Sequence, residues 1–281
     1  MPHHILITGV STGIGYATAQ ALLQRGYHVF GSVRSAADAD RVQAELGARF
    51  TPLLFDVTDH AAIETAVSQL ATTLDGANLF GLVNNAGISV TGPLLHLPLA
   101  ELRQQFEVNL FGLLDVTQQV LPLLGARQGA PRPRGRIVNV SSVSGRIAYP
   151  FMGAYAASKH ALEALSDALR RELLLYGIDV IVVEPGTTAT PIIDKAGAGA
   201  AQYSHTDYQP MLAAMTGSEI EKRRRSAIPV ERVSRVIVEA LESPRPKTRY
   251  PVPRKWLTGW LLPRLLPDRW LDRLVARQLK L

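Results

Sequence analysis

Thr8-Gly-Val-Ser-Thr-Gly-Ile-Gly15 is a glycine-rich turn between a predicted strand, His4–Thr8, and a predicted helix near Ile14–Gln24. Only glycine lets a backbone come close to a pyrophosphate, and the first turn of a helix offers free N–H groups to its negative charge. The spacing differs from the usual G-x-G-x-x-G, so an ordinary strand–helix turn is the competing interpretation. Its position at the start of a strand–helix unit favours the phosphate-binding interpretation.

Short β-rich runs alternate with helical stretches along the rest of the chain, which is the pattern of a parallel α/β sheet. Right-handed crossovers would wind these elements into a Rossmann-type, doubly wound, seven-stranded parallel sheet with helices on both faces. The further predicted strands are His28–Val33, Phe50–Phe55, Leu79–Val83, Arg136–Val140, Asp179–Glu184 and Lys247–Val252. The further predicted helices lie near Ala37–Leu46, Ala61–Thr73, Leu99–Leu124 and Met152–Tyr176.

Composition limits the class of protein. The 281 residues are 47% apolar and 19% charged, which is ordinary globular usage. The chain has no cysteine, which excludes disulfides, thiolate metal ligands and a cysteine nucleophile. No apolar run approaches the ~18 residues of a membrane span, and the early glycine motif leaves no room for a secretory signal. We therefore expect a cytoplasmic protein, and the histidines lack the spacing of metal ligands, so we expect no metal site.

The net charge of +6 is concentrated in patches such as Pro131–Arg134 and Lys222–Arg225. Such a charge can attract nucleic acid, anionic lipid or an acidic partner. No nucleic-acid-binding module accompanies the patches, and aromatic residues make up only 6% of the chain. We interpret the patches mainly as solvated surface and expect no nucleic-acid partner.

The chain divides into one predicted catalytic domain, residues 1–253, and an amphipathic tail, residues 254–281. Within the domain, residues from about 187 to 228 interrupt the alternation of strands and helices and are predicted to form a substrate lid. The tail holds all three tryptophans, many leucines and several basic residues, while Pro263 and Pro267 limit any continuous helix to its last dozen residues. Two interpretations stay open: peripheral contact with a membrane, or packing over the lid or a neighbouring subunit.

Further motifs follow the predicted strands at their carboxyl ends, where open α/β sheets bind ligands. In order along the chain they are Asp56-Val57, Asn84-Asn-Ala-Gly87, Ser141-Ser142, Tyr155-Ala-Ala-Ser-Lys159 and Pro185-Gly186. Together with the glycine turn, this series resembles the short-chain dehydrogenase/reductase family over residues 4 to about 190. A weaker likeness over Thr190–Tyr250 is to the hydroxysteroid and retinol dehydrogenase branch. The resemblance implies hydride transfer between a nicotinamide dinucleotide and an alcohol or carbonyl compound.

The second strand ends in Gly31-Ser-Val-Arg34, without the acid that NAD-specific sites place there. A guanidinium can pair with the 2′-phosphate of NADP, so we expect NADP, with NADPH as its reduced form. Some relatives that prefer NADP carry a basic residue where Thr12 stands, so use of NAD stays open. The resemblance implies that the cofactor is held by Gly9, Ser11, Thr12, Gly13, Ile14, Gly15, Arg34, Asp56, Val57, Asn84, Ala86, Gly87, Tyr155, Lys159, Pro185, Gly186 and Thr190.

Tyr155 and Lys159 are four residues apart and would share one face of a helix. A nearby ammonium would stabilise the phenolate and lower the tyrosine pKa toward the range useful for general acid–base catalysis. Ser142, with Ser141 as the competing candidate, matches the family hydroxyl that polarises the carbonyl. Asn109 matches the asparagine that in relatives anchors a water linked to the lysine.

The segment between Ser142 and Tyr155 is mostly apolar and lines the substrate pocket in the family. We expect Ser142, Tyr149, Phe151 and Tyr155 to contact a hydrophobic alcohol, ketone or aldehyde that is steroid-, retinoid- or lipid-like. Three alternatives stay open. The first is a 3-oxoacyl reductase acting on an acyl carrier protein, and the second is a regulator that binds NADPH without turnover. The third is a membrane or nucleic-acid adaptor that acts through the basic patches. Relatives are usually oligomeric, so a homodimer or homotetramer is expected.

Overall fold

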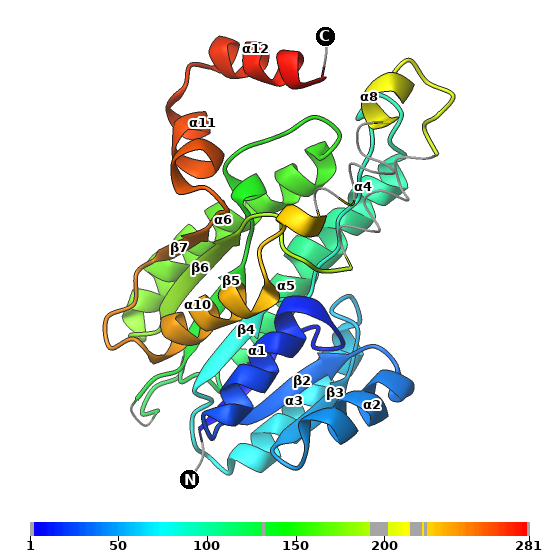
Figure 1. The fold of residues 1–281 in the computed structure, drawn as a ribbon. Helices are drawn as coiled ribbons and strands as arrows, with labels where there is room; N and C mark the ends of the chain where they lie inside the picture. Colours follow the sequence, from blue (N-terminus) through cyan, green and yellow to red (C-terminus); the bar gives the residue numbers. More distant parts are fainter. Residues whose placement is uncertain (1–2, 131–132, 192–201, 214–220, 222–223, 280–281) are drawn as a thin grey trace.

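The computed structural model describes residues 3–130, 133–191, 202–213, 221 and 224–279 (Figure 1). Seven parallel strands form one sheet in the order β3-β2-β1-β4-β5-β6-β7. This is the predicted doubly wound α/β fold, in which the order reverses between β1 and β4. The strands are β1 (His4–Ile7), β2 (His28–Val33), β3 (Phe50–Leu54), β4 (Gly81–Asn84), β5 (Arg136–Val140), β6 (Asp179–Pro185) and β7 (Arg249–Val252).

Helices cover both faces of the sheet, and each face has its own apolar core. One core joins the sheet to α1, α2 and α10 through residues such as Leu22, Val42 and Ile237. The other joins it to α3, α5 and the end of α6, with Ile63 and Val116 fully buried. The helices are α1 (Gly13–Gln24), α2 (Ala36–Leu46), α3 (His60–Leu74), α4 (Leu99–Phe106), α5 (Leu113–Val120), α6 (Gly153–Glu172), α8 (Gln209–Ala213), α10 (Val230–Glu242), α11 (Leu262–Leu265) and α12 (Asp268–Leu279).

The helix predicted over Leu99–Leu124 is not continuous. A wider, π-helical turn, η1 (Glu107–Gly112), separates α4 from α5. At Gly112 a side chain would lie 2.3 Å from the carbonyl oxygen of Val57, so only glycine lets the helix pass that close to the loop after β3. Turns of this kind often occur at functional sites, and this one carries the candidate residue Asn109.

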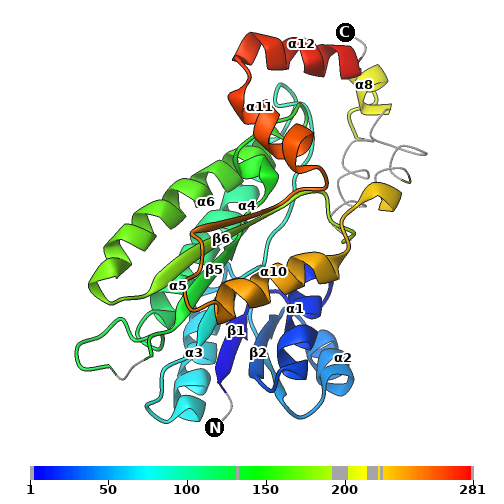
Figure 2. The same ribbon diagram turned by 60° about the vertical axis from the view of Figure 1, so that its left-hand side comes forward.

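The chain leaves β7 at the carboxyl edge of the sheet and forms the tail. A π-helical turn, η4 (Leu257–Leu261), leads into α11 and α12, which cross above the sheet toward α8 (Figures 1 and 2). The prediction that prolines confine the last helix to about a dozen residues is confirmed by α12. Pro263 does not end the helical run, because η4 continues directly into α11 and Pro263 lies at the start of α11.

The end of the tail packs on a described part of the segment that was predicted to form the lid. Leu279 contacts a cluster of Phe151, Tyr203 and Leu212, which joins the loop before α6 to the segment around α8. One of the two interpretations of the tail, packing over the lid, is therefore observed for this end of α12. Much of the predicted lid, including the Ala196–Ala200 run, lies outside the described residues. Among the described residues, no helix combines the length and apolarity needed to cross a membrane.

Candidate active site

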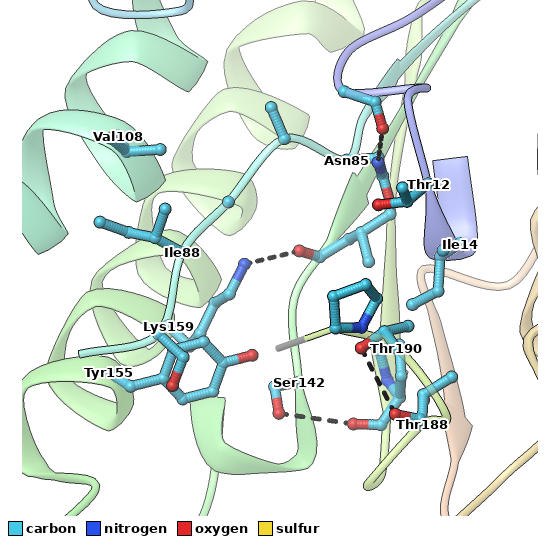
Figure 3. A pocket seen from close by; sticks show the side chains of 18 of the residues that line it. Thr12, Ile14, Asn85, Ile88, Val108, Ser142, Tyr155, Lys159, Thr188 and Thr190 are labelled. Carbon is cyan, nitrogen blue, oxygen red and sulfur yellow. Dashed lines mark hydrogen bonds between the residues drawn. The ribbon is translucent and has the colours of Figure 1, made fainter. Parts of the chain in front are cut away.

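A cavity of about 750 Å³ opens at the carboxyl ends of the strands, where the strand order reverses (Figure 3). It brings together most of the predicted site residues although they are spread over nearly two hundred positions of the chain. Those that line it are Gly9, Ser11, Thr12, Gly13, Ile14, Arg34, Asp56, Val57, Ala86, Gly87, Ser142, Tyr155, Lys159, Pro185, Gly186 and Thr190. Gly15, Asn84, Asn109, Tyr149 and Phe151 are not among the lining residues.

The glycine turn has the shape of a phosphate cradle. Gly9 has a φ of +71°, a conformation that favours glycine, and its backbone lies against Ala86 of the loop after β4. Gly15 packs against the carbonyl of Gly9, where a side chain would lie only 2.2 Å from the oxygen. Thr12 precedes α1 without a side-chain cap, so the first N–H groups of the helix are free to face an anion.

The end of β2 presents one accessible guanidinium. The Arg34 side chain is 71% exposed and lies 3.9 Å from the Asp56 carboxylate, a distance that gives only a weak ion pair. A second arginine, Arg41, was not predicted: it donates to the carbonyl of Ser11 and pairs with Asp38. Arg41 therefore holds the glycine turn, while Arg34 stays available to a ligand phosphate.

The two asparagines after β4 have different roles. Asn84 is buried beneath the cavity and donates to Thr117 and to Asn139 of β5. Asn85 lines the cavity, and its amide bonds the carbonyls of Thr8 and Gly9. Adjacent residues at a strand end point to opposite sides. The sequence motif alone does not reveal which asparagine faces the ligand.

Tyr155 and Lys159, from α6, meet Ser142, from the end of β5, on one wall of the cavity (Figure 3). The Lys159 ammonium donates to the carbonyl of Val140 at 2.8 Å and lies 5.9 Å from the centre of the Tyr155 ring. The Ser142 hydroxyl donates to the carbonyl of Pro185 at 3.4 Å and accepts from the Ser144 amide. These three side chains thus surround a space in which one small polar group of a substrate could sit.

The protonation states of this wall follow mainly from burial. Burial raises the pKa of Tyr155, and hydrogen bonding from Ser142 acts in the opposite direction. The expected lowering of the Tyr155 pKa by the Lys159 ammonium is not found in this geometry. Burial lowers the pKa of Lys159 to about 8, with the negative charge of Glu163 opposing the change. Tyr155 is therefore protonated at neutral pH and is set up as a proton donor.

Asn109 lies behind the cavity wall. Its side chain is fully buried and bonds both the amide and the carbonyl of Ile88, and it also donates to Ser158 on α6. Gln105, one turn earlier and not predicted, bonds Ile88 and the amide of Val90. Both side chains fix the loop after β4 against α6. The structure therefore places Asn109 as a positioning residue.

Tyr149 and Phe151, predicted to contact the substrate, do not line the cavity. Tyr149 is half-buried, and Phe151 is buried with a φ of +66°, an uncommon conformation for a residue with a side chain. The Phe151 ring packs edge-on against Tyr208 of the lid segment. Among apolar residues of the same loop, Val143 and Met152 line the cavity instead.

A buried charge network adjoins Lys159 and was not predicted. Glu163, one turn after Lys159, pairs with Arg146 and Arg249. The same two arginines reach Glu184, which is fully buried and accepts a 2.9 Å hydrogen bond from the Trp260 indole of the tail. Burial and the charge of Glu163 raise the pKa of Glu184. Because Glu184 precedes the cavity residues Pro185 and Gly186, the network links the tail to the cavity wall.

A profile described as short chain dehydrogenase matches residues 3–201. The chain belongs to the short chain dehydrogenase family. It is therefore an oxidoreductase of alcohols and carbonyl compounds, as the resemblance of its motifs implied.

Similar proteins extend the likeness beyond the matched segment. The chain is 42% identical to an NADPH-dependent 3-dehydrocapnine reductase of Ornithobacterium rhinotracheale, over 99% of this chain and 97% of that protein. It is 33% identical to human retinol dehydrogenase 5, over 94% and 86% of the two chains. Among solved structures, an actinorhodin polyketide ketoreductase with NADPH superimposes with a TM-score of 0.76 at 26% identity, covering 90% of this chain and 95% of that one.

Proposed function

We propose that this protein uses NADPH to reduce a ketone or aldehyde on a hydrophobic, lipid-like molecule, and that it also catalyses the reverse oxidation. The observation that carries this proposal is the meeting of Ser142, Tyr155 and Lys159 on one wall of a cavity whose opposite end is the phosphate cradle.

The cavity fits a dinucleotide. The backbone of Gly9 and the uncapped start of α1 form a cradle for a pyrophosphate, and Arg34 is free to bind a 2′-phosphate. Asp56, Val57, Pro185, Gly186 and Thr190 line the same cavity, which supports the proposal that they contact the rest of the dinucleotide. When bound, NADPH supplies a hydride to the carbonyl carbon of the substrate.

The chain's own residues handle the proton. The Ser142 hydroxyl donates to the substrate oxygen and stabilises the charge that develops on it. Tyr155 transfers its phenolic proton to this oxygen, so the carbonyl carbon gains one hydrogen, the oxygen gains the other and an alcohol forms. The Lys159 ammonium, held by Val140, places a positive charge on the same wall, 5.9 Å from the centre of the Tyr155 ring. In oxidation the same steps run backward.

Two observations support a hydrophobic substrate. The walls that flank Ser142 and Tyr155 carry Ile88, Val108, Val143 and Met152. The relatives that match nearly the whole chain include a protein named for 3-dehydrocapnine and one named for retinol. An apolar wall contributes binding energy along a long substrate, and Ser142 with Tyr155 fixes the position of its oxygen.

The test is the fall in absorbance at 340 nm as NADPH is oxidised. The panel pairs each long-chain ketone or aldehyde, steroid ketone and retinal with a short, water-soluble compound that bears the same carbonyl. We expect turnover with kcat/KM rising with apolar length, and its loss in Tyr155→Phe. Turnover restricted to the short compounds would refute the substrate class. Tight NADPH binding without turnover of any carbonyl would favour a regulator and refute the enzyme.

A further inference from the structure

The tail exposes apolar side chains to an unusual degree. Six of the thirteen large apolar side chains that the described residues expose lie within it. Each is between 40% and 69% exposed, and we call them the tail face: Trp256, Leu257, Leu262, Leu265, Trp270 and Leu274. A segment that exposes this many large apolar side chains is a candidate binding surface.

The tail is anchored, so this exposure does not come from a free chain end. Trp260 turns inward and donates to buried Glu184, and Arg264 stacks 4.3 Å from the centre of the Trp260 ring. Leu279 packs in the lid cluster at the far end. With both ends held, the tail presents the outward side chains Trp256, Trp270 and Leu274 in a fixed arrangement.

The tail face lies at the end of the molecule that carries the lid. The parallel strand β7 brings the chain to the carboxyl edge of the sheet, where the cavity opens, and α11 and α12 continue from there to α8 (Figures 1 and 2). Leu97 packs in the same cluster as Leu279. It lies between the exposed loop residues Leu94 and Leu95 and the exposed Leu99, the first residue of α4, so exposed leucines of a second segment lie near this end.

The charges of the tail decide among its partners. Residues 254–279 contain six arginines and lysines but only two acids, Asp268 and Asp272. A second copy docked about a twofold axis would bring two such basic faces together, which costs free energy. An anionic lipid surface instead attracts the arginines, and tryptophan and leucine side chains enter the boundary between headgroups and acyl chains.

We propose that the tail face docks the protein on the surface of an anionic lipid bilayer. The helices lie flat on the surface, with Trp256, Trp270 and Leu274 inserted and the arginines at the level of the phosphates. Docking in this orientation turns the lid and the cavity toward the bilayer. The proposal concerns location and does not require the assigned chemistry to be correct.

The protein carries its own probe, because Trp256, Trp260 and Trp270 are its only tryptophans. Vesicles of phosphatidylcholine and phosphatidylglycerol in equal parts, and of phosphatidylcholine alone, are added to the full chain. We expect a blue shift of the tryptophan emission and co-sedimentation with the anionic vesicles, both weakened by salt.

Two double variants distinguish vesicle binding by the tail face from nonspecific binding by exposed leucines elsewhere. Trp270→Ser with Leu274→Ser should lower partitioning into anionic vesicles by about tenfold or more, because two inserted apolar side chains are lost. Leu174→Ser with Leu175→Ser is the matched control: these leucines are 72% and 81% exposed at the opposite edge of the sheet, before β6. The control should bind as the parent does, and both variants should keep activity on a water-soluble carbonyl.

Three outcomes would overturn the proposal. The first is no binding to anionic vesicles, and the second is equal binding by the Trp270/Leu274 variant and the parent. The third is self-association, measured by sedimentation velocity, that the Trp270/Leu274 substitutions abolish while vesicles remain unbound. That result would assign the tail face to a second copy.

Discussion

The residues up to Gly186 and the residues after it differ in how their side chains are packed. The first part supplies six of the seven strands, the cradle and the catalytic wall, and its polar side chains are tied in buried hydrogen bonds such as Asn84 to Asn139. The second part adds one edge strand, the helices α8 and α10, and a tail that leaves tryptophan and leucine side chains in solvent. The difference indicates that buried hydrogen bonds hold the cavity in the first part, while much of the second part's apolar surface remains exposed.

The largest expected effect lies in the first part. Tyr155→Phe removes the transferable proton and should lower kcat by about a hundredfold to ten-thousandfold, the usual range for a general acid. NADPH affinity, measured by quenching of protein fluorescence, should stay the same. Tyr27→Phe, whose hydroxyl lies near Glu242 far from the cavity, is the control. Full activity in Tyr155→Phe would disprove the assigned mechanism.

The burial of Lys159 in the cavity wall should lower the free energy of unfolding. Its folded pKa of about 8 lies below the 10.5 of an exposed lysine, so between these values the unfolded chain binds more protons and stability rises with pH. At pH 7 the buried ammonium therefore destabilises the folded state. The free energy of unfolding of Lys159→Met should be about 2 kcal/mol higher than that of the parent, and the variant should lose activity.

Urea unfolding across pH checks this prediction, with the exposed Lys255→Met as the control. The advantage of Lys159→Met should shrink as pH rises from about 8 toward 10, because the parent lysine then becomes neutral in the folded state. A variant less stable than the parent at every pH would show that the Val140 and Glu163 contacts outweigh the cost of burial.

Arg34→Ala should weaken the binding of NADPH but not that of NADH. The guanidinium has no strong internal partner, so its removal should raise the KM for NADPH by about tenfold and leave that for NADH unchanged. Steady-state kinetics with both cofactors measure this, and Arg25→Ala, at the far end of α1, serves as the control. Equal losses with NADPH and NADH would place Arg34 in a structural role.

The smallest expected effect concerns the hydrogen bond from Trp260 to Glu184, which connects the two parts. Trp260→Phe removes the donor to buried Glu184 and should lower the free energy of unfolding by about 1–2 kcal/mol, with kcat nearly unchanged. Trp270→Phe, an exposed neighbour in the tail, should change neither. Thermal unfolding followed by circular dichroism distinguishes them, and identical midpoints for both variants would mean that Glu184 does not depend on the tail.

The sequence predicted the sheet and most of the catalytic wall because these depend on local patterns. Glycine, strand and strand-end motifs follow one another at fixed offsets, and parallel pairing brings their ends to one edge. The π-helical turn at Glu107–Gly112 could not be predicted, because it depends on the approach of Gly112 to the Val57 carbonyl. The exchange of roles between Asn84 and Asn85 was hidden for another reason. Every residue of β4 is buried, so no alternation marks its faces.

Long-range pairing hid the charge network as well. Glu163 and Arg249 are 86 residues apart, and neither belongs to a motif. The one available signal was the spacing of Glu163, four residues after Lys159 on the same helix. The orientation of the tail could not be predicted either, because its leucines and tryptophans are compatible with both a packed and an exposed face.

The cradle is already assembled by contacts within the protein. The Thr8 hydroxyl accepts from the amides of Asn85 and Ala86, and the Gly9 amide donates to the Ser32 hydroxyl, so strand β2 and the loops after β1 and β4 form one frame. Little conformational entropy is left to lose when a ligand enters such a frame. Ligand binding and folding are then thermodynamically linked, because any opening that separates these strands also destroys the site. A saturating dinucleotide should consequently protect the amide hydrogens of all three strands from exchange together.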